Sequence, residues 1–139
     1  MKKIRFYKNT DYKSLIHLLK KNNMFDKVWE NKKSIEKKNI TDNKSIIVVV
    51  KKKNIIWCIF LEEYWQCIMF RRLCIQKKYR NQWLWSLLLH QVETIAKKRW
   101  IEQIWLFVEQ QKKHIRKRYS YRNYKKEKDY TFMYKNITL

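Results

Sequence analysis

Residues 73–89 read LCIQKKYRNQWLWSLLL, the pattern of a strand that passes through a basic loop into a helix. Leu73-Cys74-Ile75 closes an apolar segment, about Gln66 to Gln76, that predicts a long strand. A helix is expected from about Leu84, because its apolar residues recur on one face and Lys97-Lys98-Arg99 put cations near the negative end of the helix dipole. The loop between them therefore lies against a helix N-terminus.

The flanking segments predict a layered α/β domain. Upstream, β-branched and apolar runs predict strands at residues 4–7, 45–50 and 55–61. Helices are expected between the first two of these strands, one after an N-cap in Asn9-Thr10-Asp11 and one at about residues 28–38. Downstream we expect a strand at 101–108, a basic helix at about 111–121 and a closing strand at 130–135. The order is β, α, α, β, β, β, α, β, α, β, with a helix crossing over between two strands.

The composition fits one domain that spans residues 1–139. A hydrophobic content of 45% and an aromatic content of 16% argue against disorder. The basic start is not followed by the apolar stretch of a signal peptide, and the longest apolar run, Ile55–Leu61, is too short to span a membrane. The cysteines and histidines show no metal-ligand or disulfide spacing (Cys58, Cys67, Cys74, His17, His90, His114). We expect a cytoplasmic protein with no metal site and no membrane contact.

The net charge of +22 predicts attraction to acidic partners. The lysines are scattered in pairs and triples along the whole chain, so they form no single stripe that would indicate nucleic acid. A biased gene composition explains such scatter better than a selected partner does. The chain also has no Gly and no Pro, against an expectation of about ten and about seven from average usage.

Residues 70–89 resemble the acetyl-CoA-binding motif of the GNAT superfamily of N-acetyltransferases. In that family a strand L-x-V leads into R/Q-x-x-G-x-G/A at the start of the main helix. Leu73-Cys74-Ile75 matches the strand, and Arg80-x-x-Trp83-x-Trp85 matches the loop if both tryptophans stand in glycine positions. Further on, Leu106-Phe107-Val108 and Tyr119–Tyr124 resemble the later family pattern, with Asn123 on its glycine.

The resemblance implies a GNAT-like α/β (α+β) fold, with a mixed, mostly antiparallel sheet of six to seven strands and about four helices. It implies acetyl-CoA as co-substrate, bound by the strand and the loop (Leu73, Cys74, Ile75, Arg80, Asn81, Gln82, Trp83, Leu84, Trp85, Ser86). Tyr119 is then the candidate general acid. Glu109 is the first candidate for the base, with Glu62, Glu63 or a chain of waters as alternatives.

Five tryptophans depart from this pattern, because small GNAT proteins commonly have Gly at their positions (Trp57, Trp65, Trp83, Trp85, Trp100). Trp100 is unexpected even without the family, since the residue just past a helix is normally a left-handed Gly. A codon translated here as Trp is read as Gly in the source, the chain was built without Gly, or the gene has drifted under mutational bias. The missing Pro residues favour bias or design as part of the cause.

Two functions remain open from the sequence. The first is transfer of an acetyl group from acetyl-CoA to a primary amine of a small molecule or peptide, by a monomer or homodimer. The second is an inactive GNAT-like domain that binds nucleic acid non-specifically through lysines, arginines and exposed aromatic rings. The state of the Trp83–Trp85 loop separates the two, because glycines there let a pyrophosphate approach the backbone.

Overall fold

The computed structural model describes residues 1–80, 82–107, 112–126, 133 and 135–138. The chain forms two compact units, Met1–Leu106 and Phe107–Leu139. The sheet and helices α1 to α3 belong to the first unit, and α4 (Lys113–Ser120) belongs to the second. None of the described helices is both long enough and apolar enough to cross a membrane.

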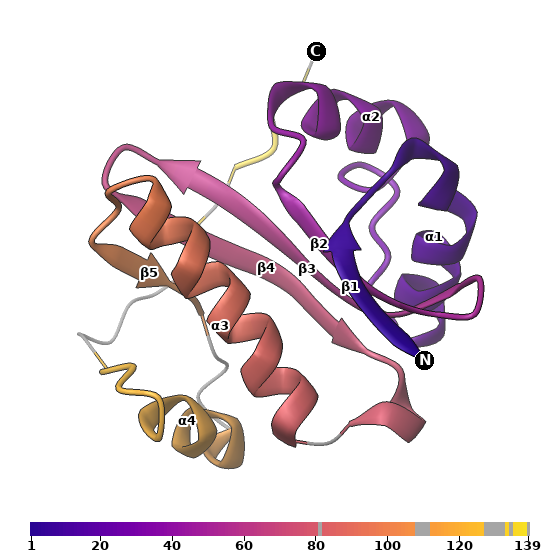
Figure 1. Ribbon diagram of the computed structural model, residues 1–139. Helices are drawn as coiled ribbons and strands as arrows, with labels where there is room; N and C mark the ends of the chain where they lie inside the picture. Colours follow the sequence, from indigo (N-terminus) through magenta and orange to yellow (C-terminus); the bar gives the residue numbers. More distant parts are fainter. Residues whose placement is uncertain (81, 108–111, 127–132, 134, 139) are drawn as a thin grey trace. The chain divides into compact units, whose positions relative to one another are not determined.

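A mixed sheet forms the centre of the first unit (Figure 1). Its five strands lie side by side in sequence order: β1 (Lys2–Phe6), β2 (Ile46–Lys51), β3 (Asn54–Tyr64), β4 (Cys67–Ile75) and β5 (Gln103–Trp105). The first four pair antiparallel, whereas β5 runs parallel to β4 because α3 carries the chain back along the sheet. The predicted fold class is confirmed. The strand count is five among the described residues rather than six to seven, and the closing strand expected at 130–135 lies mostly outside them.

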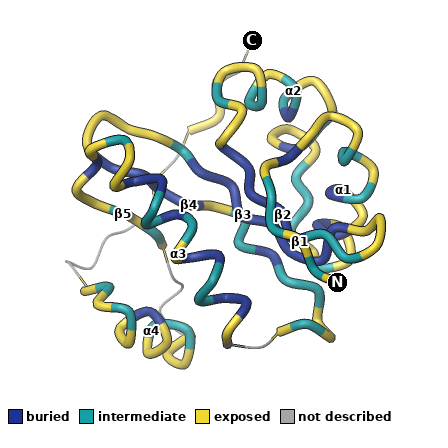
Figure 2. The backbone as a smooth tube through the Cα atoms, viewed as in Figure 1, coloured by how far each residue is buried: buried dark blue, intermediate teal, exposed yellow. Residues whose placement is uncertain are grey.

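Both faces of the central strands are buried (Figure 2). One face packs against α1 (Tyr12–Lys21) in a cluster that includes Leu15, Leu19, Val48, Cys58 and Phe60. The alternate strand residues Ile47, Val49 and Trp57 point to the other face by the period of two and are as deeply buried. Figure 1 shows α3 (Gln82–Lys98) crossing the sheet on that side. A sheet covered on both faces explains why β2 and β3 read as continuous apolar runs.

The α1–α2 connection differs from the prediction. The second helix was expected at about 28–38, but α2 covers Lys32–Thr41. The Asn31 side chain accepts a hydrogen bond from the Ser34 N–H at 3.0 Å and caps the helix, which therefore begins four residues later than predicted. The preceding segment folds instead into a turn, in which the Glu30 N–H donates to the Asp26 carbonyl at 2.8 Å. Asp11 also differs, since its carboxylate accepts from the Lys8 N–H and Arg5 and does not cap α1 directly.

A tryptophan occupies the left-handed turn that ends α3. The Ile101 N–H donates to the Ala96 carbonyl at 2.9 Å, the Trp100 N–H donates to Lys97 at 3.2 Å, and Trp100 has φ 56°. This is the Schellman arrangement, in which Gly is preferred. Asn23 after α1 and Asn123 after α4 hold the same place with positive φ.

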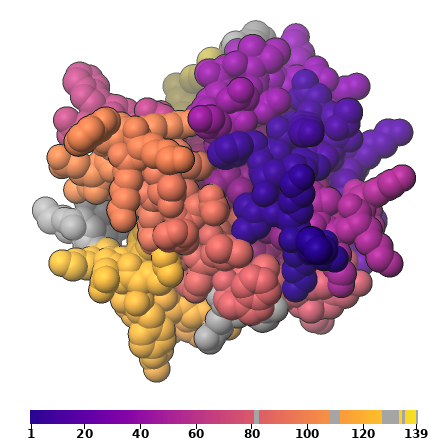
Figure 3. Space-filling view, viewed as in Figure 1, coloured from indigo at the N-terminus to yellow at the C-terminus, as the bar shows by residue number. Residues whose placement is uncertain are grey.

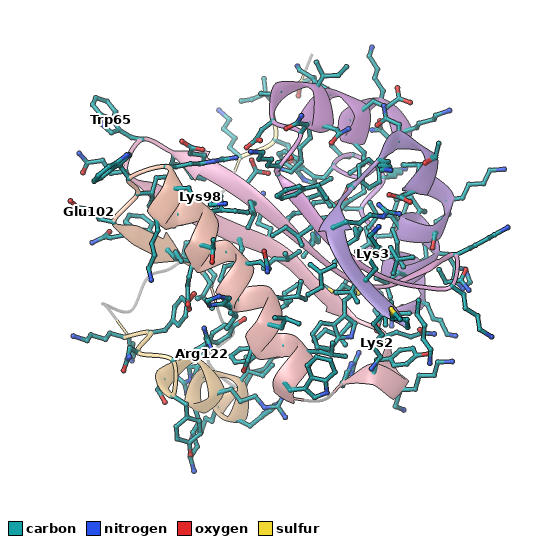
Figure 4. The ribbon with its side chains drawn as sticks, in the orientation of Figure 1. Lys2, Lys3, Trp65, Lys98, Glu102 and Arg122 are labelled. Atoms are coloured by element: carbon teal, nitrogen blue, oxygen red, sulfur yellow. The ribbon has the colours of Figure 1, made fainter. Side chains whose placement is uncertain are left out.

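Trp65 is a second left-handed tryptophan, with φ 24° in the turn between β3 and β4. Its ring extends into solvent (Figure 4), and the turn projects from the surface in the space-filling view (Figure 3). The other three tryptophans in suspected glycine positions have ordinary backbone: Trp57 lies within β3, and Trp83 and Trp85 lie in α3. Backbone conformation therefore favours Gly at Trp65 and Trp100 and does not require it at the remaining three.

Candidate functional site

β4 extends past its described pairing with β5 at the predicted strand Leu73–Ile75. β5 pairs with β4 only from Cys67 to Met69 within the described residues, while β4 itself continues to Ile75. The last part of β4 therefore has β3 on one side and no described strand on the other. A sheet edge of this kind offers backbone N–H and C=O groups to an extended ligand.

A β-bulge interrupts β4 at the same place. Cys58 pairs with Cys74 and Phe60 pairs with Arg71, so the two residues Arg72 and Leu73 oppose Ile59 alone. Arg72 has φ 50°, in the left-handed region. Bulges bend a strand and redirect its side chains, and they are frequent next to active sites.

The loop after β4 is short and leads directly to a helix N-terminus. It holds the 3-10 turn Lys77–Tyr79, and α3 begins at Gln82. The first-turn N–H groups of an α-helix and the positive end of its dipole together favour an anion. The sequence expectation of a strand, a basic loop and a helix is met, with the helix two residues earlier than predicted.

The predicted loop residues differ in their contacts and in their exposure. The Arg80 side chain turns back and donates from Nε to the Ile75 carbonyl at 3.1 Å and from Nη2 to Asn22 Oδ1 at 2.9 Å. Leu84 and Trp85 are buried, Ser86 is half-buried, and Trp83 is 57% exposed with the Lys2 ammonium 5.3 Å from its ring centre. Asn81 and the side chain of Gln82 lie outside the described residues. Arg80 thus braces the loop against α1.

Three lysines surround Tyr79 within this loop, a feature that the sequence alone did not reveal. The ammonium groups of Lys2, Lys51 and Lys78 lie 5.3, 5.0 and 5.1 Å from the centre of its ring. A hydrogen bond from Lys51 lowers the pKa of the Tyr79 phenol, and the charge of Lys78 adds to this effect. The three lysines come from β1, β2 and the 3-10 turn, so only the tertiary fold brings them together.

Of the predicted strand residues, Cys74 could offer only its backbone to a ligand at the edge of β4, because its side chain points into the core. Its side chain is buried in the cluster around α1, with Sγ 3.9 Å from the Leu18 carbonyl oxygen. It pairs across the sheet with Cys58, and burial raises the pKa of the Cys58 thiol. These two cysteines and Cys67 are free, buried thiols, as expected from the sequence.

The carboxylates near β4 form ion pairs. Lys38 Nζ lies 3.0 Å from Glu62 Oε1, and Arg99 Nη1 lies 2.5 Å from Glu63 Oε2. Both glutamates stand opposite the Cys67–Met69 part of β4, away from Leu73. Glu109 lies outside the described residues, so its predicted role as the base stays a prediction. Within the described chain, no cluster of His, Cys, Asp and Glu is arranged to hold a metal.

Tyr119 lies in the second unit, near the end of α4. It is buried, and its ring meets that of Tyr124 edge to face, with 5.5 Å between centroids and 66° between planes. The turn after α4 places Asn123 at φ 65°, where the family pattern has glycine. The local geometry of the later motif is therefore present, and the catalytic role of Tyr119 stays a prediction.

Glu30 was missed by the sequence reading and is the most deeply buried carboxylate described. It is 1% exposed and forms an ion pair with Arg72 Nε in the bulge of β4. Its sequence neighbourhood, Asp26-Lys27-Val28-Trp29-Glu30, carries no recognised pattern. The only signal is an acidic side chain next to a tryptophan in a very basic chain.

No family model matches the sequence, and no curated protein matches it. Solved structures match over nearly the whole chain. PaiA N-acetyltransferase from Thermoplasma acidophilum, in complex with coenzyme A, has a TM-score of 0.76 at 18% identity, covering 94% of this chain and 93% of its own. A predicted acetyltransferase from Clostridium acetobutylicum, with acetyl-CoA, has a TM-score of 0.76 at 14% identity, covering 96% of both chains. Glucosamine-6-phosphate N-acetyltransferase from Arabidopsis thaliana has a TM-score of 0.74 at 13% identity, covering 98% of this chain and 99% of its own. This protein has the fold of the GNAT N-acetyltransferases.

Proposed function

We propose that this protein transfers an acetyl group from acetyl-CoA to a primary amine. The observation that carries the proposal is that β4 continues past its pairing with β5, so that Leu73–Ile75 has no described strand on that side, and leads directly into a short loop and the N-terminus of α3. Structures of the same fold hold coenzyme A or acetyl-CoA. The pantetheine arm would pair with the open edge of β4, and the pyrophosphate would accept from the first-turn N–H groups of α3.

The reaction needs three contributions from this chain. A backbone N–H of the Leu73–Ile75 segment would polarise the thioester carbonyl, because a fixed donor stabilises the oxyanion that develops there. The amine nitrogen attacks the carbonyl carbon and passes its proton to a base, for which Glu109 or a water is the candidate. The C–S bond then breaks, and the thiolate takes a proton from an acid, for which Tyr119 is the candidate.

The tryptophans of the loop decide whether this site has room for the pyrophosphate of acetyl-CoA. Trp83 and Trp85 have helical backbone. The first turn of α3, which presents the N–H groups, therefore forms without glycine. Trp83 is exposed beneath Lys2, and Trp85 is packed inside the unit. Glycines at these positions would contribute room for the pyrophosphate rather than a special conformation.

Isothermal calorimetry with acetyl-CoA tests the proposal directly. The chain is titrated beside the double variant Trp83→Gly/Trp85→Gly, with Trp100→Gly as a control that makes the same exchange outside the loop. Binding by the unchanged chain in the micromolar range supports the proposal. Binding by the double variant alone would show that the two indoles block the site, and it would overturn the proposed function for the unchanged chain. No binding by any of the three contradicts an acetyl-CoA site altogether.

Nucleic-acid binding is the second candidate, favoured by one observation. The lysines around Tyr79 and the exposed ring of Trp83 combine ammonium groups with aromatic faces, the chemistry that holds single strands. Fluorescence anisotropy with a labelled single-stranded oligonucleotide measures it. Saturable binding that acetyl-CoA does not displace, by a chain that fails in calorimetry, would make this candidate the better one. For either function we propose a cytoplasmic location, with which the buried free thiols are consistent. We also propose that the protein is a monomer or a homodimer.

A further inference from the structure

A buried carboxylate holds one side chain of the β4 bulge in place. Glu30 Oε1 accepts from Arg72 Nε, and Glu30 Oε2 accepts from the Asp26 N–H at 3.1 Å. The Tyr12 hydroxyl also donates to the Glu30 carbonyl at 3.0 Å and fixes the backbone of the same residue. Burying a carboxylate is costly, and a buried ion pair is weak evidence for stability. The arrangement is better explained by the position that it gives to Arg72.

The bulge turns two consecutive arginines to the same side of the sheet. Adjacent residues of a regular strand point to opposite faces. Here Arg72 reaches Glu30, while the Arg71 guanidinium lies 5.9 Å from the centre of the Trp29 ring. Because Trp29 and Glu30 are neighbours on the α1–α2 connection, both arginine side chains reach this one segment. The left-handed Arg72 and the two-to-one register of the bulge account for it.

These two arginines keep donors that are not used within the described residues. Neither Nη atom of Arg72 has a hydrogen-bond partner there, and the Arg72 side chain is 33% exposed. Arg71 is exposed and has no carboxylate partner in the same part of the chain, while Trp29 beneath it is 63% exposed. Glu30 compensates the charge of Arg72, so the net positive charge of the group comes from Arg71. Arg72 adds a guanidinium edge that Glu30 holds in a fixed position. Such an edge matches the two oxygens of a carboxylate or phosphate.

We propose that Arg71 and Arg72, positioned by Trp29 and Glu30, bind an acidic group on the acceptor amine. This inference rests on the proposed function, because it uses the position of the bulge at the start of Leu73–Ile75, where acetyl transfer would occur. The substrate class is a small amine that also carries a carboxylate or a phosphate monoester. The guanidinium pair would hold the acid while the amine approaches the thioester.

Steady-state assays with matched amines test the substrate class. The probes are O-phosphoethanolamine with ethanolamine, glucosamine 6-phosphate with glucosamine, and β-alanine with β-alaninamide. Release of the CoA thiol gives kcat/KM for each. We expect the acidic member of at least one pair to exceed its neutral member by tenfold or more, as hydrogen bonds to charged groups allow. The phosphate and carboxylate pairs show which acid the site takes.

Two variants test the residues. Arg71→Gln is expected to lower the acidic-to-neutral ratio of kcat/KM about tenfold, since it removes the uncompensated charge. Glu30→Gln should lower the same ratio by releasing Arg72, which a purely structural role would not change. Lys33→Gln, an exposed charge on α2, is the matched control and should leave the ratio unchanged. The dissociation constant of acetyl-CoA should stay constant in all three.

The outcomes separate this inference from the proposed function. A panel in which no acidic amine is acetylated, or a ratio that Arg71→Gln leaves unchanged, overturns the acidic-acceptor site. Acetyl-CoA binding measured by calorimetry in the absence of any amine is independent of that result. If the unchanged chain does not bind acetyl-CoA, the proposed function itself is overturned.

Discussion

Trp100 shows what a single residue costs in a turn built for glycine. Its φ of 56° and the hydrogen bonds of Ile101 and Trp100 back into α3 define the turn completely, so the side chain must adapt to it. Its indole is almost fully exposed and offsets little of that cost by burial. The sequence predicted this conflict at Trp100 because the helix end was clear from Lys97-Lys98-Arg99. For Trp57, Trp83 and Trp85 the family pattern suggested glycine, but these residues lie in β3 and α3 with ordinary backbone that does not require it.

Trp100→Gly should therefore stabilise the protein. Relief of the left-handed penalty of about 1–2 kcal/mol exceeds the loss of the few contacts that an exposed ring makes. Urea unfolding should show a higher midpoint with an unchanged slope. Trp105→Gly, in a strand with ordinary backbone, is the control and should destabilise. A lower midpoint for Trp100→Gly would show that the indole has a packing role.

At the scale of elements, periodicity predicted existence and type better than boundaries. The strands around Val48 and Cys58 were found because both faces are buried, which forces continuous apolar sequence. The start of α2 was misplaced, since the cap at Asn31 outweighs the apolar residues Val28 and Trp29, which remain exposed. The candidate site also had one part that the sequence predicted and one part that it did not. The loop was predictable from its motif, whereas the bracing role of Arg80 and the Glu30–Arg72 pair depend on contacts between distant segments.

The link between β1 and α1 provides a pH-dependent test. Two hydrogen bonds from Arg5 to the Asp11 carboxylate, at 2.6 and 2.9 Å, lower the pKa of Asp11. A carboxyl whose folded-state pKa is depressed contributes stability above its unfolded pKa of about 3.9 and loses it as pH falls through the folded value. Asp11→Asn should thus be less stable at about pH 7 and match the unchanged chain in strong acid.

Urea unfolding of both chains at about pH 7, 4 and 2 measures this difference. Glu102→Gln, an exposed carboxylate with no ion pair in the described residues, is the control and should give parallel curves. A difference between Asp11→Asn and the unchanged chain that stays constant down to the lowest pH would mean that the ion pair does not contribute.

At the scale of the whole molecule, a few acidic residues form ion pairs in a very basic chain. There are 12 Asp and Glu residues against 34 Lys and Arg residues. Among the described residues, five acids form ion pairs, and each joins segments distant in sequence or links neighbouring elements (Asp11, Glu30, Asp42, Glu62, Glu63). The excess cations are left at the surface, where they attract any polyanion through a long-range field. Charge alone therefore does not distinguish acetyl-CoA from nucleic acid.

Salt dependence can make that distinction. A single-stranded oligonucleotide held by scattered lysines should lose affinity steeply between about 50 and about 500 mM salt, with a logarithmic slope near −0.7 for each phosphate neutralised. Acetyl-CoA should weaken far less, because it has few charges and would rely on the backbone of β4 and the first turn of α3. Calorimetry and anisotropy over the same salt series give both slopes. If acetyl-CoA binding disappears as steeply as that of the oligonucleotide, its attraction is diffuse charge, and the open edge of β4 is not a cofactor site.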